Sequence, residues 1–559
     1  MYNPTNPVIV QGDRTLLLEV HHPAYEDVRD ALGRFADLEK SPEHIHTYRI
    51  SPLSLWNAAA SGLTSHSVQD CLVTYSKYDI PQSVLADITT HMERYGIVRL
   101  IKEEDQLILT SHDSYVILEL ANRKEIRPYI SNQLDTLRLL VQPGMRGHIK
   151  HALVRIGFPV EDLAGYVVGD YLAIHLSALT SNGQPLQLRD YQKQAVDVFY
   201  AGGANHGGSG VIVLPCGAGK TITGIAAMTQ IQSETLILTT NTTALRQWKQ
   251  ELLDKTDLSE DCIGEYSGER KEIKPVTITT YQMLTHRQGA SQEFPHIDLF
   301  TKQNWGFIIY DEVHLLPAPV FRITAEIQAK RRLGLTATLI REDGLENDVF
   351  SLIGPKKYDV PWKALEKQGW IAEAHCVEIR IPMPELIKMD YAMAPLRDKF
   401  RIAAENPDKV TIIHQLLAKH QGHHVLIIGQ YVNQLQEIAT VLNVPIITGK
   451  TNNSERIRLY DQFKKGELPT LVVSKVANFA IDLPDANVAI QISGTFGSRQ
   501  EEAQRLGRIL RPKPDTNESY FYSIVTANSR EQDFATKRQL FLTEQGYKYK
   551  IITTQELEV

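Results

Sequence analysis

The chain has 559 residues, of which 43% are hydrophobic and 22% charged, a composition typical of a globular protein with roughly three to five domains. This excludes a disordered or fibrous chain, and no run approaches the roughly 18 apolar residues of a membrane span. The four cysteines are too far apart for a disulfide framework or a zinc site, which indicates a reducing cytoplasm. A net charge of −7 argues against a strongly basic nucleic-acid coat protein, because phosphate contacts require Lys and Arg.

The charge is distributed unevenly along the chain. Residues 1–121, the acidic head, contain nine basic and 17 acidic residues, whereas residues 122–158, the basic segment, contain seven and two. If the basic segment binds nucleic acid, we expect Arg146, Lys150 and Arg155 to contact phosphate. The ordinary alternative is a local fluctuation of charge without a function.

The acidic head begins with two short apolar runs, at 8–10 and 16–18, which predict a pair of strands around a turn. Residues 67–77 and 81–95 are predicted to be helical, and strand-like runs follow at 97–101 and 106–110. Two helices followed by a β-hairpin is the order of a winged helix, which can place a helix in a DNA groove. The same order also serves protein contacts, so both alternatives stay open.

Short Val- and Ile-rich runs alternate with helical stretches from about residue 186 onward. Such runs are typical of strands buried on both faces of a parallel sheet, and their number favours two α/β domains in tandem. The predicted strands are 211–214, 235–239, 276–279, 307–310, 333–335, 425–428, 470–473 and 488–492.

The first of these strands leads into a glycine-rich turn, Pro215-Cys216-Gly217-Ala218-Gly219-Lys220-Thr221, and then a predicted helix at 222–228. Glycines let backbone N–H groups face a phosphate, and the helix N-terminus adds partial positive charge. Lys220 can reach the β- and γ-phosphates, and the Thr221 hydroxyl can bind Mg²⁺. Leu214 stands where the strict pattern has a glycine.

Two acidic residues, Asp311 and Glu312, follow the strand predicted at 307–310. A carboxylate at the end of a neighbouring strand can bind the Mg²⁺ of a nucleotide, which suits Asp311. Glu312 can orient or deprotonate an attacking water. Together with the glycine-rich turn, these acids predict ATP hydrolysis rather than a surface turn.

Far downstream, Arg508 and Arg511 share one face of a predicted helix. Arginines directed at a γ-phosphate stabilise transition-state charge, and these two fall in the second α/β domain. We therefore expect ATP to bind in a cleft between the two domains. The alternative is a solvated basic helix.

These motifs together resemble those of the superfamily-two helicases, and their particular residues resemble the XPB family of DNA helicases. The resemblance covers about residues 145–545 and is loose in the head. Its motifs are Leu188-Arg189-Asp190-Tyr191-Gln192, the glycine-rich turn, Asp311-Glu312-Val313-His314, Leu335-Thr336-Ala337-Thr338, Arg341-Glu342-Asp343, Ser474-Lys475-Val476, Asp482-Leu483-Pro484-Asp485-Ala486-Asn487, Gln491-Ile492-Ser493 and the run 501–511.

The resemblance implies a role for each matching residue. Arg189 and Gln192 would bind adenine, and Gly217, Ala218, Gly219, Lys220 and Thr221 would bind the phosphates, with Thr221 and Asp311 on Mg²⁺. Gln504, Arg508 and Arg511 would contact the γ-phosphate and join Lys220 and Glu312 in catalysis. The residues implied in coupling to DNA are His314, Thr336, Thr338, Arg341, Glu342, Asp343 and Asp482.

The implied fold is α/β, with two tandem RecA-like parallel-sheet domains behind N-terminal α+β accessory domains. The expected divisions are an accessory domain at 1–121 (winged-helix-like at about 67–121), a basic damage-recognition-like module at 122–185, RecA-like domains at 186–357 and 358–530, and a C-terminal tail at 531–559. A short stretch at about 383–408 would be a thumb-like insertion, and residues 477–480 are apolar where the family has polar coupling residues.

By resemblance, the chain is predicted to be an ATP- and Mg²⁺-dependent DNA helicase of 3′-to-5′ polarity, working in DNA repair of the nucleotide-excision kind. It would bind single-stranded DNA and duplex junctions without sequence specificity, because backbone contacts carry little base information. The alternatives are a double-strand translocase that does not separate strands, an ATP-switched scaffold that recruits a nuclease to the head, and a nucleotide-binding protein with no role on DNA. The oligomeric state is not predicted.

Overall fold

The computed structural model describes residues 3–40, 44–104, 106–164, 169–204, 207–286, 296, 299–316, 331–337, 346–474, 486–494, 502, 505–507, 509, 510 and 517–557. The chain divides into two compact units. The first contains residues 1–39, 43–214 and 219–360, and the second contains residues 40–42, 215–218 and 361–559. Within the described ranges, no helix is long and apolar enough to cross a membrane.

The first unit begins with a four-stranded sheet of order β1-β2-β4-β3. Ile9 pairs with Leu17 in antiparallel register, which confirms the strand pair predicted around the turn at 11–14. Helices α2, α3 and α4 follow, and α2 starts at a capping box on Ser51. The elements are β1 Val8–Val10, β2 Thr15–Glu19, α1 Tyr25–Leu32, β3 Asp37–Lys40, β4 Ile45–Arg49, α2 Pro52–Ala60, α3 Ser65–Tyr75 and α4 Gln82–Arg94.

A second sheet, of order β7-β8-β6-β5-β9, contains the predicted hairpin. The helix–helix–hairpin order of the sequence is present, but β6 also pairs with β8 and β5 pairs with β9. One sheet therefore runs across the expected boundary at residue 121 and joins the hairpin to the basic segment. The elements are β5 Val98–Glu103, β6 Gln106–Ser111, α5 Ser114–Asn122, β7 Ile130–Gln133, β8 Arg138–Val141, α6 Arg146–Arg155 and β9 Val160–Asp162.

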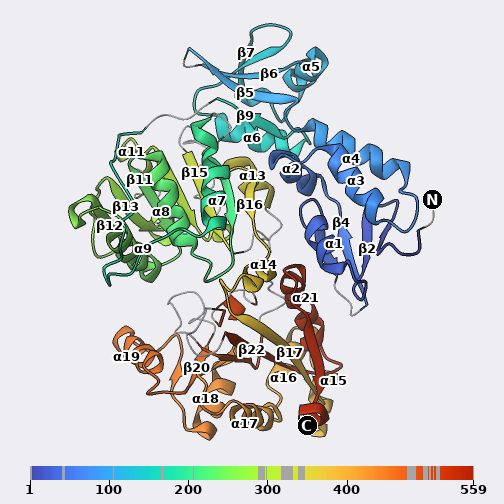
Figure 1. The fold of residues 1–559 in the computed structure, drawn as a ribbon, viewed down its shortest axis with the longest axis vertical. Coiled ribbons are helices and arrows are strands. Elements are labelled where there is room, and N and C mark those ends of the chain that lie inside the picture. The colour runs from blue at the N-terminus through green and yellow to red at the C-terminus, as the bar shows by residue number, and fades with distance from the viewer. Residues whose placement is uncertain are drawn as a thin grey trace. The chain divides into compact units, whose positions relative to one another are not determined.

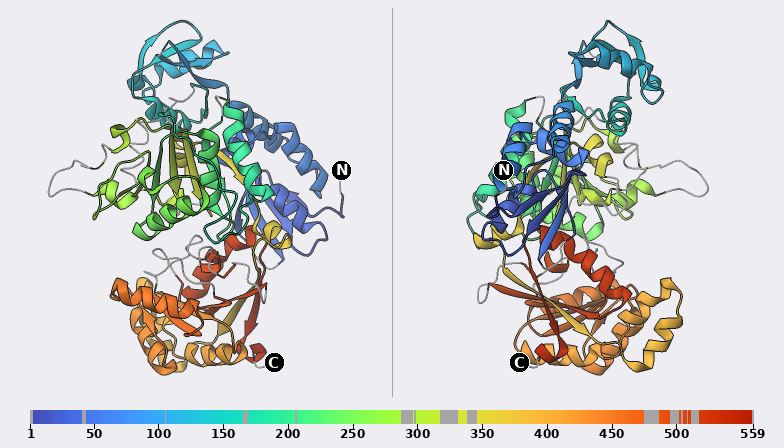
Figure 2. Two further views of the ribbon diagram at one scale, coloured as in Figure 1. Left: turned by 60° about the vertical axis from the view of Figure 1, so that its left-hand side comes forward. Right: turned by 90° about the vertical axis from the view of Figure 1, so that its right-hand side faces the viewer.

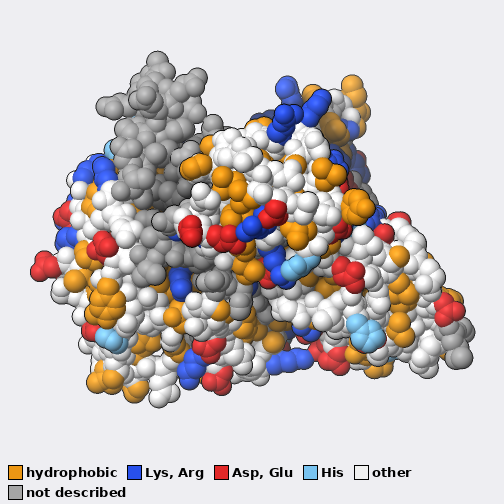
Figure 3. Space-filling model, turned by 90° about the horizontal axis from the view of Figure 1, so that it is seen from above, with side chains coloured by type: hydrophobic (Ala, Val, Ile, Leu, Met, Phe, Trp, Pro, Cys, Tyr) orange, Lys and Arg blue, Asp and Glu red, His pale blue; other side chains and the backbone are white. Residues whose placement is uncertain are grey.

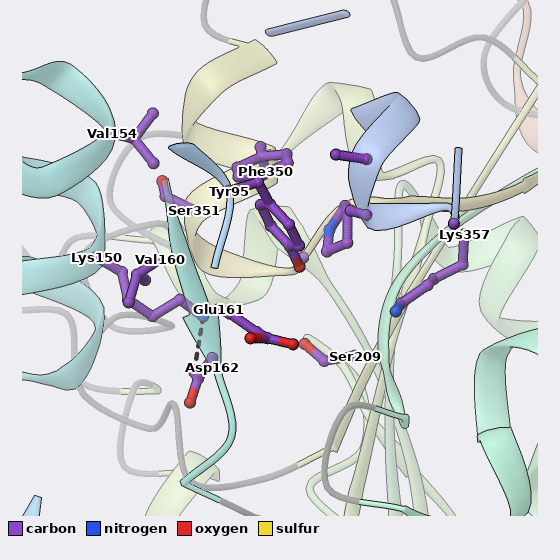
Figure 4. Close-up of a pocket in the computed structure, with 15 residues that line it drawn as sticks. Tyr95, Lys150, Val154, Val160, Glu161, Asp162, Ser209, Phe350, Ser351 and Lys357 are labelled. Carbon is purple, nitrogen blue, oxygen red and sulfur yellow. Dashed lines mark hydrogen bonds and ion pairs between the residues drawn. The ribbon is translucent and has the colours of Figure 1, made fainter. Parts of the chain in front are cut away.

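Two basic side chains of the basic segment lie inside the fold. Arg146 and Lys150 of α6 are buried and bind Asp162 of β9 at 2.6 and 2.9 Å, the second pair being drawn in Figure 4. The expectation that these two side chains contact DNA phosphate is wrong, because both belong to an internal ion-pair network. Arg155 is exposed, so its phosphate contact stays a prediction.

The rest of the first unit is built on a parallel sheet of seven strands, ordered β12-β13-β11-β14-β15-β10-β16, with helices packed on it (Figure 1). Its central strands are buried along their length, as the Val- and Ile-rich runs predicted. The strands are β10 Ser209–Val213, β11 Thr235–Thr239, β12 Ile263–Tyr266, β13 Val276–Thr280, β14 Phe307–Asp311, β15 Arg331–Thr336 and β16 Lys356–Asp359. The helices are α7 Asp190–Tyr200, α8 Lys220–Ile231, α9 Thr242–Lys255, α10 Tyr281–Thr285, α11 Leu299–Lys302 and α13 Glu346–Leu352.

The second unit contains another parallel seven-stranded sheet, ordered β19-β20-β18-β21-β22-β17-β23 (Figure 2). Its strands are β17 Glu373–Ile381, β18 Val425–Gly429, β19 Ile446–Ile447, β20 Thr470–Ser474, β21 Val488–Gln491, β22 Glu518–Thr526 and β23 Tyr549–Thr553. Its helices are α14 Trp362–Lys367, α15 Glu385–Met393, α16 Leu396–Ala404, α17 Lys409–Lys419, α18 Val432–Leu442, α19 Asn453–Lys464, α21 Arg530–Glu544 and α22 Thr554–Leu557. The expected pair of RecA-like domains is confirmed.

The expected C-terminal tail at 531–559 is part of the fold, and the thumb-like role expected at about 383–408 stays a prediction. The stretch expected to be a C-terminal tail contributes α21 and the edge strand β23, which pairs with β17 from Cys376↔Tyr549 onward. The thumb-like stretch at 383–408 is a helical pair, α15 and α16, and α15 exposes Leu386 and Met389.

Candidate nucleotide site

The glycine-rich turn lies where β10 ends and α8 begins, at the carboxyl edge of the first parallel sheet. The N–H of Leu214, just after β10, donates to the carbonyl of Thr336 on the neighbouring β15 at 3.0 Å. Gly217 and Gly219 have φ values of 80° and 84°, a region that side chains other than glycine rarely adopt. Gly219 is the N-cap of α8, and Lys220 and Thr221 form its first turn. This strand–turn–helix order is the one the sequence predicted for phosphate binding.

Gln192 of α7 lies directly against this turn. A Cβ atom on Gly219 would approach Gln192 Nε2 to 2.5 Å, so the glycine is required by contact as well as by φ. Gln192 is buried, and its Oε1 accepts from the backbone N–H of Arg189 at 2.9 Å, which fixes the amide at the start of α7. The Arg189 guanidinium donates to the Tyr191 hydroxyl at 3.0 Å. Of the two predicted adenine-binding residues, Gln192 therefore lies beside the phosphate turn, and Arg189 is bound to it through its backbone N–H.

Glu312 follows β14 and faces Lys220. Lys220 Nζ lies 3.2 Å from Glu312 Oε1, and both side chains are largely buried. Glu312 has a φ of 50°, a left-handed conformation that costs a non-glycine residue of order 1–3 kcal/mol. Strain of this kind is concentrated at functional sites, and here it occurs at the residue predicted to activate water.

Asp311, the last residue of β14, is held by two aromatic side chains. Trp248 Nε1 of α9 donates to Asp311 Oδ2 at 2.9 Å, and the Tyr281 hydroxyl donates to the Asp311 carbonyl at 2.9 Å. Burial, with the adjacent Glu312 carboxylate, raises the pKa of Asp311 to about 6, although the Trp248 N–H and Lys220 oppose the shift. Two neighbouring carboxylates in a buried position favour a bound cation.

No sequence signal singles out Trp248 and Tyr281, because an aromatic side chain in a helix is normally a core residue. The approach of Trp248 depends on Gly224 in α8, where a Cβ atom would lie 2.7 Å from the indole Cη2.

His314 connects the ends of two strands. Its Nδ1 lies 2.7 Å from Thr336 Oγ1 at the end of β15 and 3.5 Å from Glu312 Oε2. Both His314 and Thr336 are buried. The structure thus brings together two of the predicted coupling residues with the predicted catalytic carboxylate.

The described residues include Arg189, Gln192, Gly217, Ala218, Gly219, Lys220, Thr221, Asp311, Glu312, His314 and Thr336 from the predicted site. The other predicted site residues lie outside them, namely Thr338, Arg341, Glu342, Asp343, Asp482, Gln504, Arg508 and Arg511.

A cavity of about 190 Å³ lies elsewhere in the first unit, between α6, β9, α13 and the first residues of β10 and β16 (Figure 4). Ser209 and Lys357 line it from the amino ends of two parallel strands. The glycine-rich turn follows the carboxyl end of β10, so this cavity is separate from the candidate nucleotide site.

Three family models match the chain in succession. One described as "Helicase conserved C-terminal domain" matches residues 8–135, one described as "Type III restriction enzyme, res subunit" matches residues 185–341, and one described as "ERCC3/RAD25/XPB C-terminal helicase" matches residues 365–558. The second match includes the glycine-rich turn, Asp311 and Glu312.

Relatives of nearly full length are also found. A Kineococcus radiotolerans protein named "DNA 3'-5' helicase XPB" is 52% identical over 99% of this chain and 97% of its own length. A Mycobacterium tuberculosis protein of the same name is 54% identical over 99% of this chain and 98% of its own length. An Encephalitozoon cuniculi protein named "General transcription and DNA repair factor IIH helicase/translocase subunit XPB" is 34% identical over 98% of this chain and 83% of its own length.

Proposed function

The chain belongs to the XPB family of helicases, and on that premise we propose that it is an ATP-dependent DNA helicase of 3′-to-5′ polarity that works in DNA repair. The observation that carries this proposal is the convergence of Lys220 and Glu312, 3.2 Å apart, at the carboxyl edge of a parallel sheet. A glycine-rich turn with its lysine can hold the phosphates, and an acidic residue beside them can orient water, which are two of the parts that phosphoryl transfer to water uses.

ATP would bind with its phosphates on the backbone N–H groups of the turn and on Lys220. Both turn glycines already have the left-handed φ that directs such N–H groups outward. Gln192 lies against the same turn, which supports a role for its amide in recognising adenine. Arg189, which holds the Gln192 carbonyl oxygen, belongs to the same subsite.

Asp311 and the Thr221 hydroxyl are the oxygen ligands proposed for Mg²⁺, which prefers hard oxygen donors. The raised pKa of Asp311 fits this role, because a cation would stabilise the carboxylate that burial destabilises. Mg²⁺ bound there with the nucleotide would neutralise charge that develops on the phosphates.

Glu312 is proposed to orient the attacking water and accept its proton. While Lys220 is paired with the Glu312 carboxylate, that carboxylate is a weaker proton acceptor. When Lys220 binds a phosphate instead, the carboxylate can accept the proton of the water. Gln504, Arg508 and Arg511 are proposed to stabilise charge on the γ-phosphate.

Movement on DNA is proposed to be coupled to hydrolysis through His314 and Thr336, whose 2.7 Å contact joins the Glu312 turn to the end of β15. Thr338, Arg341, Glu342, Asp343 and Asp482 are the proposed DNA-coupling residues beyond this contact. DNA would be bound through its backbone without sequence preference.

The test is steady-state ATP turnover by the full chain without DNA, with single-stranded DNA and with a forked duplex. We expect strong stimulation by DNA. Turnover that is the same in all three conditions would contradict a DNA-dependent motor and favour a nucleotide-binding protein with no role on DNA.

A second candidate is a double-strand translocase, because the Encephalitozoon cuniculi relative is named as both helicase and translocase. A triplex-displacement assay beside a strand-displacement assay separates the two activities. Strand displacement supports the helicase, whereas triplex displacement alone supports the translocase. A chain that hydrolyses ATP but displaces neither would favour the scaffold that recruits a nuclease.

A further inference from the structure

Strand β16 lies at one edge of the first parallel sheet, directly beside the strand that leads into the glycine-rich turn. It pairs with β10 in parallel register, with Val211 opposite Lys356, and the N–H of Val211 donates to the carbonyl of Pro355 at 2.9 Å. The two strands approach closely at Gly210, where a Cβ atom would lie 2.5 Å from Lys357 Cγ. A displacement of β16 would therefore also displace β10, the strand that ends at the phosphate turn.

The outer edge of β16 is bound by the acidic head. An edge strand has backbone N–H groups that its own sheet cannot pair. One of them, the N–H of Lys356, donates to Oδ1 of Asn57 in α2 at 3.1 Å, and α2 lies next to β16 in Figure 1. The bond joins two residues that are 299 positions apart in the chain.

Aromatic side chains hold the same junction just before β16 begins. Trp56, the neighbour of Asn57, is 4% exposed, and its ring centroid lies 6.4 Å from that of Phe350 in α13. Tyr95, which follows α4, packs edge-on against the same ring at 6.5 Å, and both rings are labelled in Figure 4. Val154 of α6 belongs to the same buried cluster. The head therefore contacts this domain through a packed apolar core as well as through the Asn57 hydrogen bond.

Strand β16 contacts the predicted adenine-binding helix as well. The Tyr358 hydroxyl donates to Gln194 Oε1 of α7 at 3.2 Å. Burial raises the pKa of Tyr358, and so does the nearby Tyr191, which belongs to the same helix. Gln192, also in α7, lies against Gly219 of the glycine-rich turn. Strand β16 thus contacts both β10 and α7, the two elements that lead to the phosphate turn and to Gln192.

We propose that Asn57 is a positioning residue for ATP binding, which fixes β16 from the acidic head and thereby fixes the phosphate turn and Gln192. This inference rests on the proposed function, because it assigns ATP to the glycine-rich turn, and it extends the nucleotide site to a residue of the head. Asn57 acts through β16 and not on the nucleotide itself. If ATP binds the conformation in which β16 is held, the loss of this restraint weakens ATP binding.

The test measures KM and kcat for ATP, and the affinity for a fluorescent ATP analogue, in the full chain. Asn57→Ala removes the oxygen that accepts from the Lys356 N–H. We expect KM and the dissociation constant of the analogue to rise by roughly threefold to tenfold, the factor that one lost hydrogen bond gives, while kcat stays nearly unchanged. Asn57→Asp keeps an oxygen acceptor at the same place and should restore both constants to near their wild-type values.

The matched control is Asn6→Ala, which also removes a half-buried amide from the head. Asn6 Nδ2 donates to the carbonyls of Thr74 and Ser76 at 2.8 and 2.9 Å, so these bonds stay within the head. This variant should keep the wild-type KM, and thermal unfolding of each variant confirms that it is folded.

A double-mutant cycle with Tyr358→Phe tests whether β16 carries the effect. Tyr358→Phe removes the hydroxyl bound to Gln194 and should itself raise KM. If both contacts act through β16, the increase in KM of the double variant should be well below the product of the two single increases.

Three results would each overturn the inference: equal KM for Asn57→Ala and Asn6→Ala, equal impairment by Asn57→Asp and Asn57→Ala, or independent effects in the cycle. Lys220→Ala in the same assays separates this failure from that of the proposed function. Unchanged ATP binding and turnover by the Lys220→Ala chain would overturn the proposed function and the inference together.

Discussion

The hydrogen bond from Trp248 to Asp311 allows a prediction of pH dependence. The indole N–H lowers the pKa of a carboxyl that burial and Glu312 raise to about 6. Trp248→Phe removes this donor and keeps an aromatic ring. The pKa of Asp311 should therefore rise further, and the carboxylate needed for a cation should form only at higher pH.

The size of the shift follows from the strength of the bond. A hydrogen bond to a charged group contributes about 1.5–3 kcal/mol, and one pKa unit corresponds to about 1.4 kcal/mol. The acid limb of the profile of kcat/KM against pH, which reports groups of the free enzyme, should move upward by roughly one to two units. Activity near neutral pH should fall and recover at alkaline pH.

The matched control is Trp305→Phe. Trp305 is also fully buried, but its indole N–H donates to the Leu299 carbonyl at 2.8 Å. Both variants lose a buried indole, so only the variant at 248 should shift the acid limb of the ATPase profile. Superimposable profiles for the Trp248→Phe and wild-type chains would refute a role for Asp311 in the ionised state.

Four further substitutions are predicted to have distinct effects. Lys220→Ala should abolish ATP turnover, and unchanged turnover would refute the phosphate-binding turn. Glu312→Gln should still bind ATP, measured with a fluorescent analogue, but hydrolyse it on the order of 10²–10⁴-fold more slowly; wild-type single-turnover rates would exclude it as the base. Arg508→Ala should lower kcat on the order of 10³–10⁵-fold with little change in ATP affinity, whereas an equal loss of both would show a binding role. Asp162→Asn should lower the free energy of unfolding by about 3–5 kcal/mol in chemical denaturation, because it leaves two buried cations without their carboxylate; a change below about 1 kcal/mol would show that the network is dispensable.

The same network predicts an acid limit to stability. Burial alone would raise the pKa of Asp162, but Arg146 and Lys150 together hold it well below its usual range in the folded chain. This stabilisation is therefore fully present above the pKa of the unfolded carboxyl and is lost only in strong acid.

The local pattern of apolar residues is sufficient to predict the central strands of both parallel sheets. Runs such as 235–239 and 425–429 are apolar throughout because both of their faces are buried. Strands β17 and β22 are not among the predicted strands, because Glu, His, Arg and Ser interrupt their apolar residues. The short edge strand β23 carries exposed polar positions, so its residues alone predict a tail.

Contacts between distant segments could not be predicted in this way. The five-stranded sheet pairs β6 with β8 of the basic segment and β5 with β9, which follows that segment, and no local signal specifies such pairing. The charge of the basic segment predicts Arg146 and Lys150 at the surface. Both side chains lie in the interior instead, because they form ion pairs with Asp162. In the nucleotide site, the motifs that contain Lys220 and Asp311 predict phosphate and Mg²⁺ binding from the sequence alone. The hydrogen bond from the Trp248 indole to Asp311 can be recognised only in the structure.

The most direct test of the central claim is strand displacement by the full chain on partial duplexes that carry either a 3′ or a 5′ single-stranded overhang. We expect ATP-dependent displacement on the 3′-overhang substrate, little on the 5′-overhang substrate, and none with the Lys220→Ala chain. Displacement without ATP, or a preference for the 5′ overhang, would contradict it.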